Sequence, residues 1–275
     1  MASEGIRFFL DPVSMLLFTL VLIDNRWNMA LETSEQFVKI INENLKSKKP
    51  LVVVGFPGIG LVGNIACQHI IEELGMKYVG SIDSKYFPPL AVLFNGIVYM
   101  PVRIYEAPEK DIIVIISDIP IHPTASYDIS KVLIDWMQKI NAKTIVSIAG
   151  IATTTGERRV FGGATNTEWL EKIKDKTEIF QVGTISGISG SIMTECFLRG
   201  ISAVSMLGET PGPNPDPRAA VQVINVLNGI FDLSIDTEKL LNQADQIELE
   251  LSKLAEQVKT TETASPPRKE FPMYG

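Results

Sequence analysis

Three glycines near the start of the chain have a spacing that is used for nucleotide binding. Gly58, Gly60 and Gly63 follow an apolar run and precede a helical pattern, and Asp83 lies about 20 residues further on. In dinucleotide-binding proteins such glycines let a pyrophosphate approach the backbone, and the acid binds a ribose. Pro57 lacks a backbone donor and lengthens the turn. We therefore favour the alternative, in which the glycines allow a strand and a helix to pack closely.

Three charged residues are candidates for ligand binding or chemistry. Arg158 and Arg159 lie in a glycine-rich stretch, and arginine forks suit phosphate or carboxylate. The alternative for the arginines is a solvated surface or a subunit contact, which we favour. Glu209 follows an apolar run and would act either as a base or as the cap of the next turn.

The other reactive residue types are few and scattered. The chain has two cysteines, Cys67 and Cys196, and two histidines, His69 and His122. No Ser-His-Asp or Cys-His arrangement is evident, no metal-ligand spacing occurs, and there is no phosphate loop with Lys-Ser or Lys-Thr. The sequence therefore predicts no metal, no cofactor and no enzymatic activity.

The final residues, Met273, Tyr274 and Gly275, form a different kind of candidate site. An apolar side chain, a phenol and a terminal carboxylate suit a pocket with an apolar wall, a hydrogen-bond acceptor and a lysine. The polar stretch before them, residues 259–270, predicts a flexible tether. Residues 236–258 have apolar positions alternately four and three apart, which predicts an amphipathic helix, packed on its own domain or contacting another subunit. We favour packing on its own domain.

The elements that position these residues alternate between strands and helices. This pattern predicts an α/β fold with a mainly parallel twisted sheet, Rossmann-like, and helices on both faces. Asn95-Gly96 between apolar runs predicts one antiparallel hairpin. We also expect a helix beginning at Thr33 or Ser34, and a long loop over 150–165. Five loops should follow the carboxyl ends of strands and could converge on one rim, namely residues 55–63, 118–122, 150–165, 183–190 and 208–216.

Composition and length set the remaining expectations. The 275 residues carry a net charge of −7, which disfavours nucleic acid as a partner. The apolar run Val13–Ile23 is shorter than the about 20 residues that span a bilayer, so we expect no membrane insertion. Few cysteines suit a reducing cytoplasm. The predicted parts are an apolar extension over 1–28, as an added element or sequence upstream of the true start, a domain over 29–235, the helix 236–258 and the tail 259–275.

Several stretches together resemble the archaeal proteasome assembly chaperone 2 family. They are GFPGIGLVGN, the Asn-Gly hairpin, the glycine loop after SIAG, and LGETPGPNPDPRAA at 207–220, which is the more specific. The resemblance implies a fold related to nucleoside phosphorylases and hydrolases, with no established catalytic residues.

The same resemblance implies a homo-oligomer that binds the α-ring of the proteasome core particle. Met273 would then fill an apolar part of a pocket between α subunits, Tyr274 would hydrogen-bond its wall, and the Gly275 carboxylate would pair with a lysine. The oligomer number is left open by this reasoning, as is the choice between an assembly chaperone and a gate-opening activator.

Overall fold

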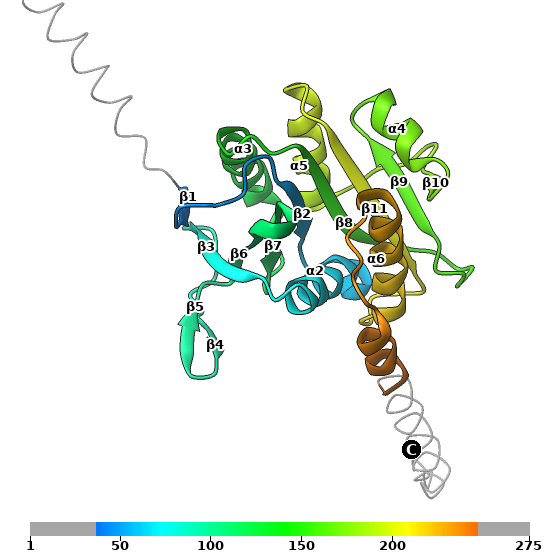
Figure 1. Cartoon of the computed structure of the whole chain (residues 1–275), viewed down its shortest axis with the longest axis horizontal. Helices are drawn as coiled ribbons and strands as arrows, with labels where there is room; N and C mark the ends of the chain where they lie inside the picture. The colour runs from blue at the N-terminus through cyan, green and yellow to red at the C-terminus, as the bar shows by residue number, and fades with distance from the viewer. Residues whose placement is uncertain (1–36, 247–275) are drawn as a thin grey trace, which may run out of the picture. The chain divides into compact units, whose positions relative to one another are not determined.

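The computed structural model describes residues 37–246, and these contain a large sheet between two layers of helices (Figure 1). The nine-stranded sheet has the order β1-β3-β6-β7-β2-β8-β11-β9-β10. The expected extension 1–28 and tail 259–275 lie outside the described residues, so the division into domains stays a prediction. In chain order the strands of this sheet are β1 (Val38–Asn42), β2 (Leu51–Gly55), β3 (Lys77–Ser84), β6 (Val102–Ala107), β7 (Ile112–Ser117), β8 (Thr144–Ala152), β9 (Val160–Ala164), β10 (Glu178–Ile179) and β11 (Ala203–Thr210).

The sheet is mixed, with a parallel centre and largely antiparallel sides. Strands β7, β2, β8 and β11 are parallel neighbours. Strands β1, β3 and β6 add antiparallel pairs on one side, and β9 runs antiparallel to β11 on the other. The α/β class is therefore confirmed, while the expectation of a mainly parallel sheet holds for the centre.

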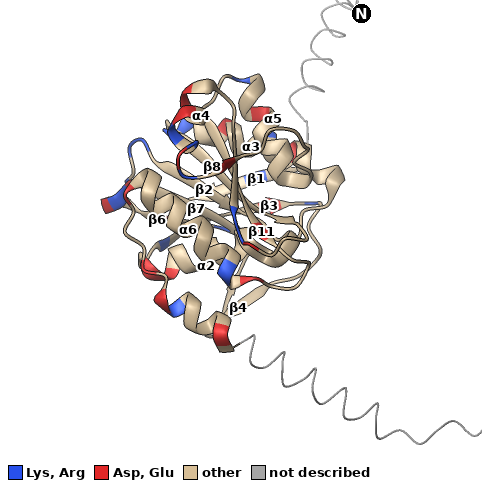
Figure 2. Ribbon diagram, turned by 90° about the vertical axis from the view of Figure 1, so that its right-hand side faces the viewer, with Lys and Arg blue, Asp and Glu red and all other residues tan. Residues whose placement is uncertain are grey.

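Helices cover both faces of the sheet, as the chain pattern predicts. Helices α2 (Val62–Glu73), α4 (Thr167–Ile173) and α6 (Pro217–Phe231) share one apolar core with the sheet. Helices α3 (Pro123–Lys139) and α5 (Gly187–Leu198) share the core on the opposite face. In Figure 2 the sheet is seen between α2 and α6 on one side and α3 and α5 on the other. Burial on both faces explains why central strands such as Ile112–Ser117 are continuously apolar.

Two expectations about local structure are wrong. The predicted helix after Thr33 is absent from the described residues 37–45, where Val38–Asn42 forms edge strand β1 beside β3. Val38 is buried and Ile40 half-buried, and the residue between them is exposed, so the period is that of a strand. The expected loop over 150–165 is shorter, because β8 continues to Ala152 and β9 begins at Val160.

Other local predictions are confirmed. Asn95 and Gly96 join β4 (Val92–Phe94) and β5 (Ile97–Tyr99) in a separate two-stranded hairpin, and both have positive φ as a tight hairpin turn requires. Residues 238–246 are helical, and Leu240 and Ala244 are buried against the domain, so this part of the predicted C-terminal helix packs on its own chain.

The glycine turn after β2 lets backbone pack directly against backbone. It contains a short 3-10 helix, η1 (Ile59–Leu61), and leads into α2. A Cβ on Gly63 would lie 2.3 Å from the Ile148 carbonyl oxygen of β8, and one on Gly55 would lie 2.1 Å from the Gly63 oxygen. On Gly150 of β8, a Cβ would lie 2.0 Å from the Ile59 oxygen. The packing interpretation therefore holds for Gly63, and for Gly60, whose Cβ would lie 2.9 Å from the Thr210 side chain, but not for Gly58, where a Cβ would meet no atom within 4 Å.

We expect Gly63→Ala to destabilise the protein by about 3 kcal/mol, because the added methyl group must push α2 away from β8. Gly58→Ala is the matched control from the same turn, since a Cβ there meets no atom within 4 Å and the backbone is extended. Urea unfolding of both variants measures the difference. Equal stability of the two would contradict the close-packing role of Gly63.

Candidate functional site

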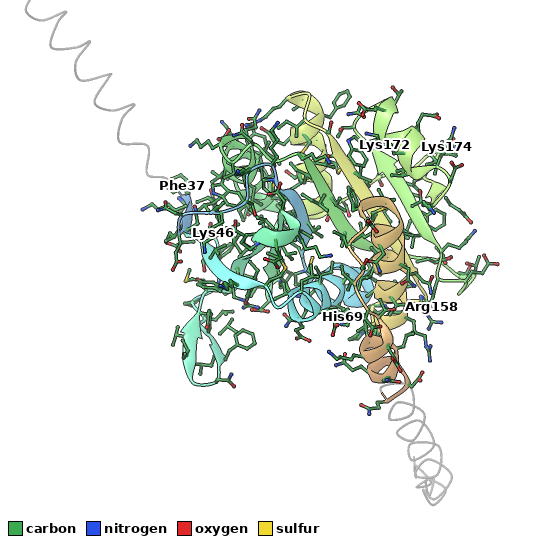
Figure 3. The ribbon with its side chains drawn as sticks, viewed as in Figure 1. Phe37, Lys46, His69, Arg158, Lys172 and Lys174 are labelled. Carbon is green, nitrogen blue, oxygen red and sulfur yellow. The ribbon has the colours of Figure 1, made fainter. Side chains whose placement is uncertain are left out.

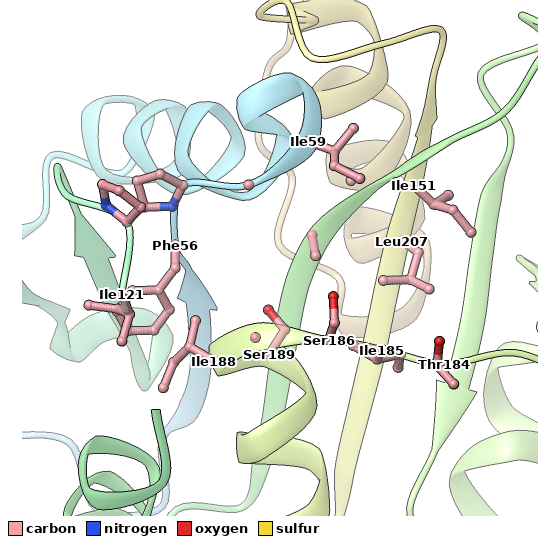
Figure 4. A pocket seen from close by; sticks show the side chains of 16 residues that line it. Phe56, Ile59, Ile121, Ile151, Thr184, Ile185, Ser186, Ile188, Ser189 and Leu207 are labelled. Carbon is pink, nitrogen blue, oxygen red and sulfur yellow. The ribbon is translucent and has the colours of Figure 1, made fainter. Parts of the chain in front are cut away.

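The predicted convergence of loops on one rim of the sheet is confirmed. A cavity of about 290 Å³ lies where the turn after β2, the loop after β7, the end of β8 and the start of α5 meet (Figure 4). Its lining is formed by Phe56, Pro57, Gly58, Ile59, Pro120, Ile121, Ala149, Gly150, Ile151, Thr184, Ile185, Ser186, Gly187, Ile188, Ser189 and Leu207. None of these side chains is charged, so the cavity offers apolar surface, hydroxyl groups and backbone polar groups.

The candidate carboxylate, Glu209, lies inside a closed hydrogen-bond cluster beside this rim. Its side chain is fully buried on β11. One carboxylate oxygen accepts from the Arg159 backbone N–H at 2.9 Å and from its Nε at 3.0 Å. The hydroxyls of Thr153 and Thr155 donate to the other oxygen. Both oxygens of this carboxylate thus accept hydrogen bonds from the protein, and its negative charge is paired with the Arg159 guanidinium.

In this environment Glu209 is poorly suited to abstract a proton near neutral pH. Hydrogen bonding by Arg159 lowers the pKa of Glu209 below its ordinary value, outweighing the opposite effect of burial, and the two threonine hydroxyls add to the lowering. A general base near neutral pH needs a raised carboxyl pKa instead. The partners of Glu209 also differ from those of the predicted turn cap: it bonds Thr153, Thr155 and Arg159, and so ties the β8–β9 segment to β11 instead of capping the turn that follows it.

The two candidate arginines are also engaged by carboxylates of the chain. Arg159 contacts Glu178 at 3.2 Å and Glu157 at 3.1 Å as well as Glu209. Arg158 Nε lies 3.2 Å from Asp216, whose side chain caps α6 by accepting from the Ala219 N–H. Figure 3 shows Arg158 on the side of the molecule where α6 lies. Both arginines therefore bridge the β8–β9 segment to neighbouring elements.

The glycine spacing is not part of a dinucleotide-binding arrangement. Asp83, the candidate ribose ligand, lies on β3, which is separated from β2 by β6 and β7 and pairs antiparallel with β1. In a dinucleotide fold the strand that carries the acid is the parallel neighbour of the glycine-turn strand. Gly58 still lines the cavity, but Gly60 and Gly63 serve to pack the turn against the sheet.

The histidines and cysteines have structural surroundings. His69 Nε2 lies 2.6 Å from the Asp236 carbonyl oxygen, joining α2 to the segment before the C-terminal helix (Figure 3). His122 caps α3 by accepting from the Thr124 N–H. Both thiols are buried, and burial raises the pKa of Cys196 to about 12. Among residues 37–246 no three potential metal ligands gather, and no helix has the length and apolarity needed to cross a bilayer.

Several residues with specific roles carry no signal in the sequence pattern. Thr153 and Thr155 hold Glu209, and Ser186 and Ser189 line the cavity. Arg103 is fully buried on β6, where it pairs with Asp118 and lies 4.8 Å from the Phe94 ring. Single hydroxyls and a lone arginine in an apolar run give no spacing to recognise, so only the folded structure identifies them.

Glu209 should make the stability of the protein depend on pH in the acid range. Its carboxyl pKa is lower when folded than the about 4.3 of an unfolded chain, so its stabilisation is complete above about pH 5. The stabilisation is lost as the pH falls below that value. We expect Glu209→Gln to lower the melting temperature at neutral pH and to flatten its fall between pH 5 and 3.

Glu157→Gln is the matched control, because Glu157 contacts the same arginine but is exposed. Its melting temperature should follow that of the unmodified protein across this pH range. An unaltered acid dependence in Glu209→Gln would contradict the role assigned to the cluster.

Comparison with known proteins identifies relatives over most of the chain. The model of the PAC2 family matches residues 52–255. The Methanocaldococcus jannaschii protein MJ0106 is 38% identical over 230 residues, covering 84% of this chain and 94% of that protein. Pyrococcus furiosus PbaA, described as an archaeal homolog of proteasome-assembly chaperone, is 32% identical, with a TM-score of 0.75 over 82% of this chain and 94% of that chain.

A second solved structure widens the range of roles among these relatives. Pyrococcus furiosus PbaB, described as an archaeal proteasome activator, is 26% identical, with a TM-score of 0.71 over 80% of this chain and 99% of that chain. The family match covers well over half of the sequence and includes the glycine turn, the cavity and the Glu209 cluster. The chain therefore belongs to the PAC2 family of proteins.

Proposed function

We propose that this protein binds the proteasome core particle as a homo-oligomer in the cytoplasm, without catalysing a reaction. Family membership and the descriptions of PbaA and PbaB support this proposal. In this proposal the protein would share a fold with nucleoside phosphorylases and hydrolases and with Rossmann-like proteins, but not their chemistry.

The candidate charged groups support a binding role over the alternative of a nucleotide or nucleoside enzyme. Glu209, Arg158 and Arg159 all pair within the domain. A side chain paired in this way stabilises the loops around it and is less available to a substrate. Asp83 lies away from the glycine turn, which leaves the nucleotide alternative without its ribose ligand.

Overall charge supports a protein partner rather than nucleic acid. The chain carries a net charge of −7, which repels a phosphate backbone. In the ribbon of Figure 2 the basic and acidic residues of the described part are interspersed.

The docking mechanism that we propose uses the tail, whose residues lie outside the described part. Met273 enters an apolar pocket of the α-ring, Tyr274 hydrogen-bonds the pocket wall, and the Gly275 carboxylate pairs with a lysine. An oligomer would present several such tails at once, and residues 259–270, proposed as a tether, would let them bind together with a gain in avidity. The terminal Met-Tyr-Gly is the single observation that carries this mechanism.

Deleting Met273–Gly275 should abolish co-sedimentation with purified archaeal core particles, because the proposed contact resides in those three residues. Tyr274→Phe is a finer variant, which keeps the ring and removes the hydroxyl, and should weaken binding less than Tyr274→Ala. Equal binding of the full and shortened chains would place the contact on the globular body and refute tail docking.

Peptidase assays on the same samples distinguish the two kinds of function. An activator increases peptide hydrolysis by mature core particles, whereas an assembly chaperone increases the yield of particles from separate subunits and leaves mature particles unchanged. No binding and no effect in either assay would refute the proposed function.

The exposed apolar side chains of the β4–β5 hairpin are an argument for self-association of the chain. Leu93 and Val98 are cross-strand partners and are each 65% exposed, and Ile97 is 60% exposed. Contiguous exposed apolar groups of this kind mark interaction surfaces. Residues 92–99 carry no charge, so two copies can meet there without the repulsion that a net charge of −7 imposes elsewhere. We propose a second copy of this chain as the occupant of the hairpin surface.

The double variant Leu93→Lys, Val98→Glu should reduce the oligomer mass measured by light scattering. Its opposite charges face each other across the strands, so the hairpin is kept while its apolar surface is lost. Val182→Lys, at a 91% exposed apolar position outside the hairpin, is the control and should leave the mass unchanged. An unchanged mass in the double variant would refute this surface as the subunit contact.

A further inference from the structure

The cavity at the rim has an apolar side and a polar side. Phe56 and Ile121 lie together on one side in Figure 4, with Ile59 and Leu207 further along the wall. The hydroxyls of Ser186 and Ser189 point into the space from the start of α5. A site of this shape orients a ligand that has one polar end and an apolar body.

The polar side of the cavity contains the N-terminus of the 12-residue helix α5, which has no capping side chain and no acidic residue in its first turn. Ser186 is the residue before this first turn. The first N–H groups of a helix have no partner within the helix and carry a partial positive charge. Gly187, with φ of +67°, follows at the first helical position and also lines the cavity. This end of α5 therefore has donors directed toward a negatively charged group.

Ser189 provides an independent indication of a ligand. Its residue is only 9% exposed, it lines the cavity, and within residues 37–246 its hydroxyl makes no hydrogen bond. Among the described residues the fully enclosed unpaired hydroxyls are those of Ser47, Ser147 and Ser205, so the Ser189 oxygen is not enclosed but reaches the space of the cavity, where it can donate to a bound molecule. Two residues along, the Ser191 hydroxyl bonds both the Ser130 hydroxyl and the Ser126 carbonyl oxygen. Of the two serines Ser189 and Ser191, the one without a partner in the described residues is thus the one that lines the cavity.

We propose that this cavity binds a small organic acid, a function separate from proteasome binding. The carboxylate accepts hydrogen bonds from the Ser189 hydroxyl and from the first N–H groups of α5, and the apolar part lies against Phe56 and Ile121. No lysine or arginine lines the cavity, which disfavours a doubly charged phosphate. At about 290 Å³ the cavity is at the small end of ligand pockets, which range from about 300 to 1,000 Å³.

The direct test is calorimetric titration of the full-length protein with phenylpropionate, benzoate and the neutral analogue phenylpropanamide. We expect one of the two acids to bind saturably and at least about tenfold more tightly than the amide, because hydrogen bonds to a charged group contribute about 1.5–3 kcal/mol. Amide resonances of residues 187–189 should shift with the acid. No saturable binding of either acid, or equal binding of acid and amide, overturns the proposal.

Two matched pairs of variants locate the site. Ser186→Asp and Ser186→Asn both supply a helix cap and should fold at least as well as the unmodified protein, but only aspartate repels a carboxylate. Ser189→Ala removes the proposed donor, and Thr194→Ala removes an exposed hydroxyl from the same helix outside this cavity.

We expect Ser186→Asp to abolish acid binding while Ser186→Asn retains more of it, and Ser189→Ala to weaken binding about tenfold relative to Thr194→Ala. Equal affinities within both pairs overturn the site. If the peptide acetyl-Pro-Met-Tyr-Gly binds more tightly than either acid, the proposal of a small organic acid is overturned, and the ligand is the C-terminal end of a peptide.

Discussion

The close approach of the α2 start to the central strands is the contact on which the rest of the structure depends. Gly55, Gly63 and Gly150 bring carbonyl groups to within 2.0–2.3 Å of where a Cβ would stand. Gly208 extends the contact to β11, where a Cβ would lie 2.8 Å from Val62. Side chains at these positions would separate the first helical turn from β2, β8 and β11, and a close-packed interior cannot absorb that displacement.

The position of this turn determines where the neighbouring loops can lie. The Asp216 N–H donates to the Gly60 carbonyl oxygen at 2.9 Å, so the turn holds the residue that caps α6. Asp216 in turn pairs with Arg158, and Arg159 joins Glu209 on the next strand. These ion pairs, each of which has a buried carboxylate and a partly exposed arginine, hold the loops of the rim together. The cavity lining and residues 92–99 of the hairpin carry no charge, and within the described residues these are the surfaces to which we assign a small ligand and a second copy of the chain.

A well-packed body suits the association function that we propose for this protein. Residues 207–220, which carry the resemblance noted in the sequence, form the end of β11, its loop and the start of α6. Loop stretches of this kind usually point to function, yet here Glu209 and Asp216 act by holding the rim together. A defined rim is also what a small-ligand cavity requires, because its donors must be held before the ligand arrives.

The sequence by itself determined the α/β class, the helices on both faces, the hairpin at Asn95-Gly96 and the convergence of loops on one rim. These features follow from local periodicity, turn chemistry and the geometry of parallel strands. Only the tertiary structure decided the strand order, which removes Asp83 from the glycine turn, and the antiparallel pairing of β1 with β3 and of β9 with β11. Strand order depends on contacts between distant segments, so local patterns cannot specify it. The same holds for the ionic partners of Glu209 and the unpaired hydroxyl of Ser189, because hydrogen bonding is a property of the folded surroundings and not of the residue type.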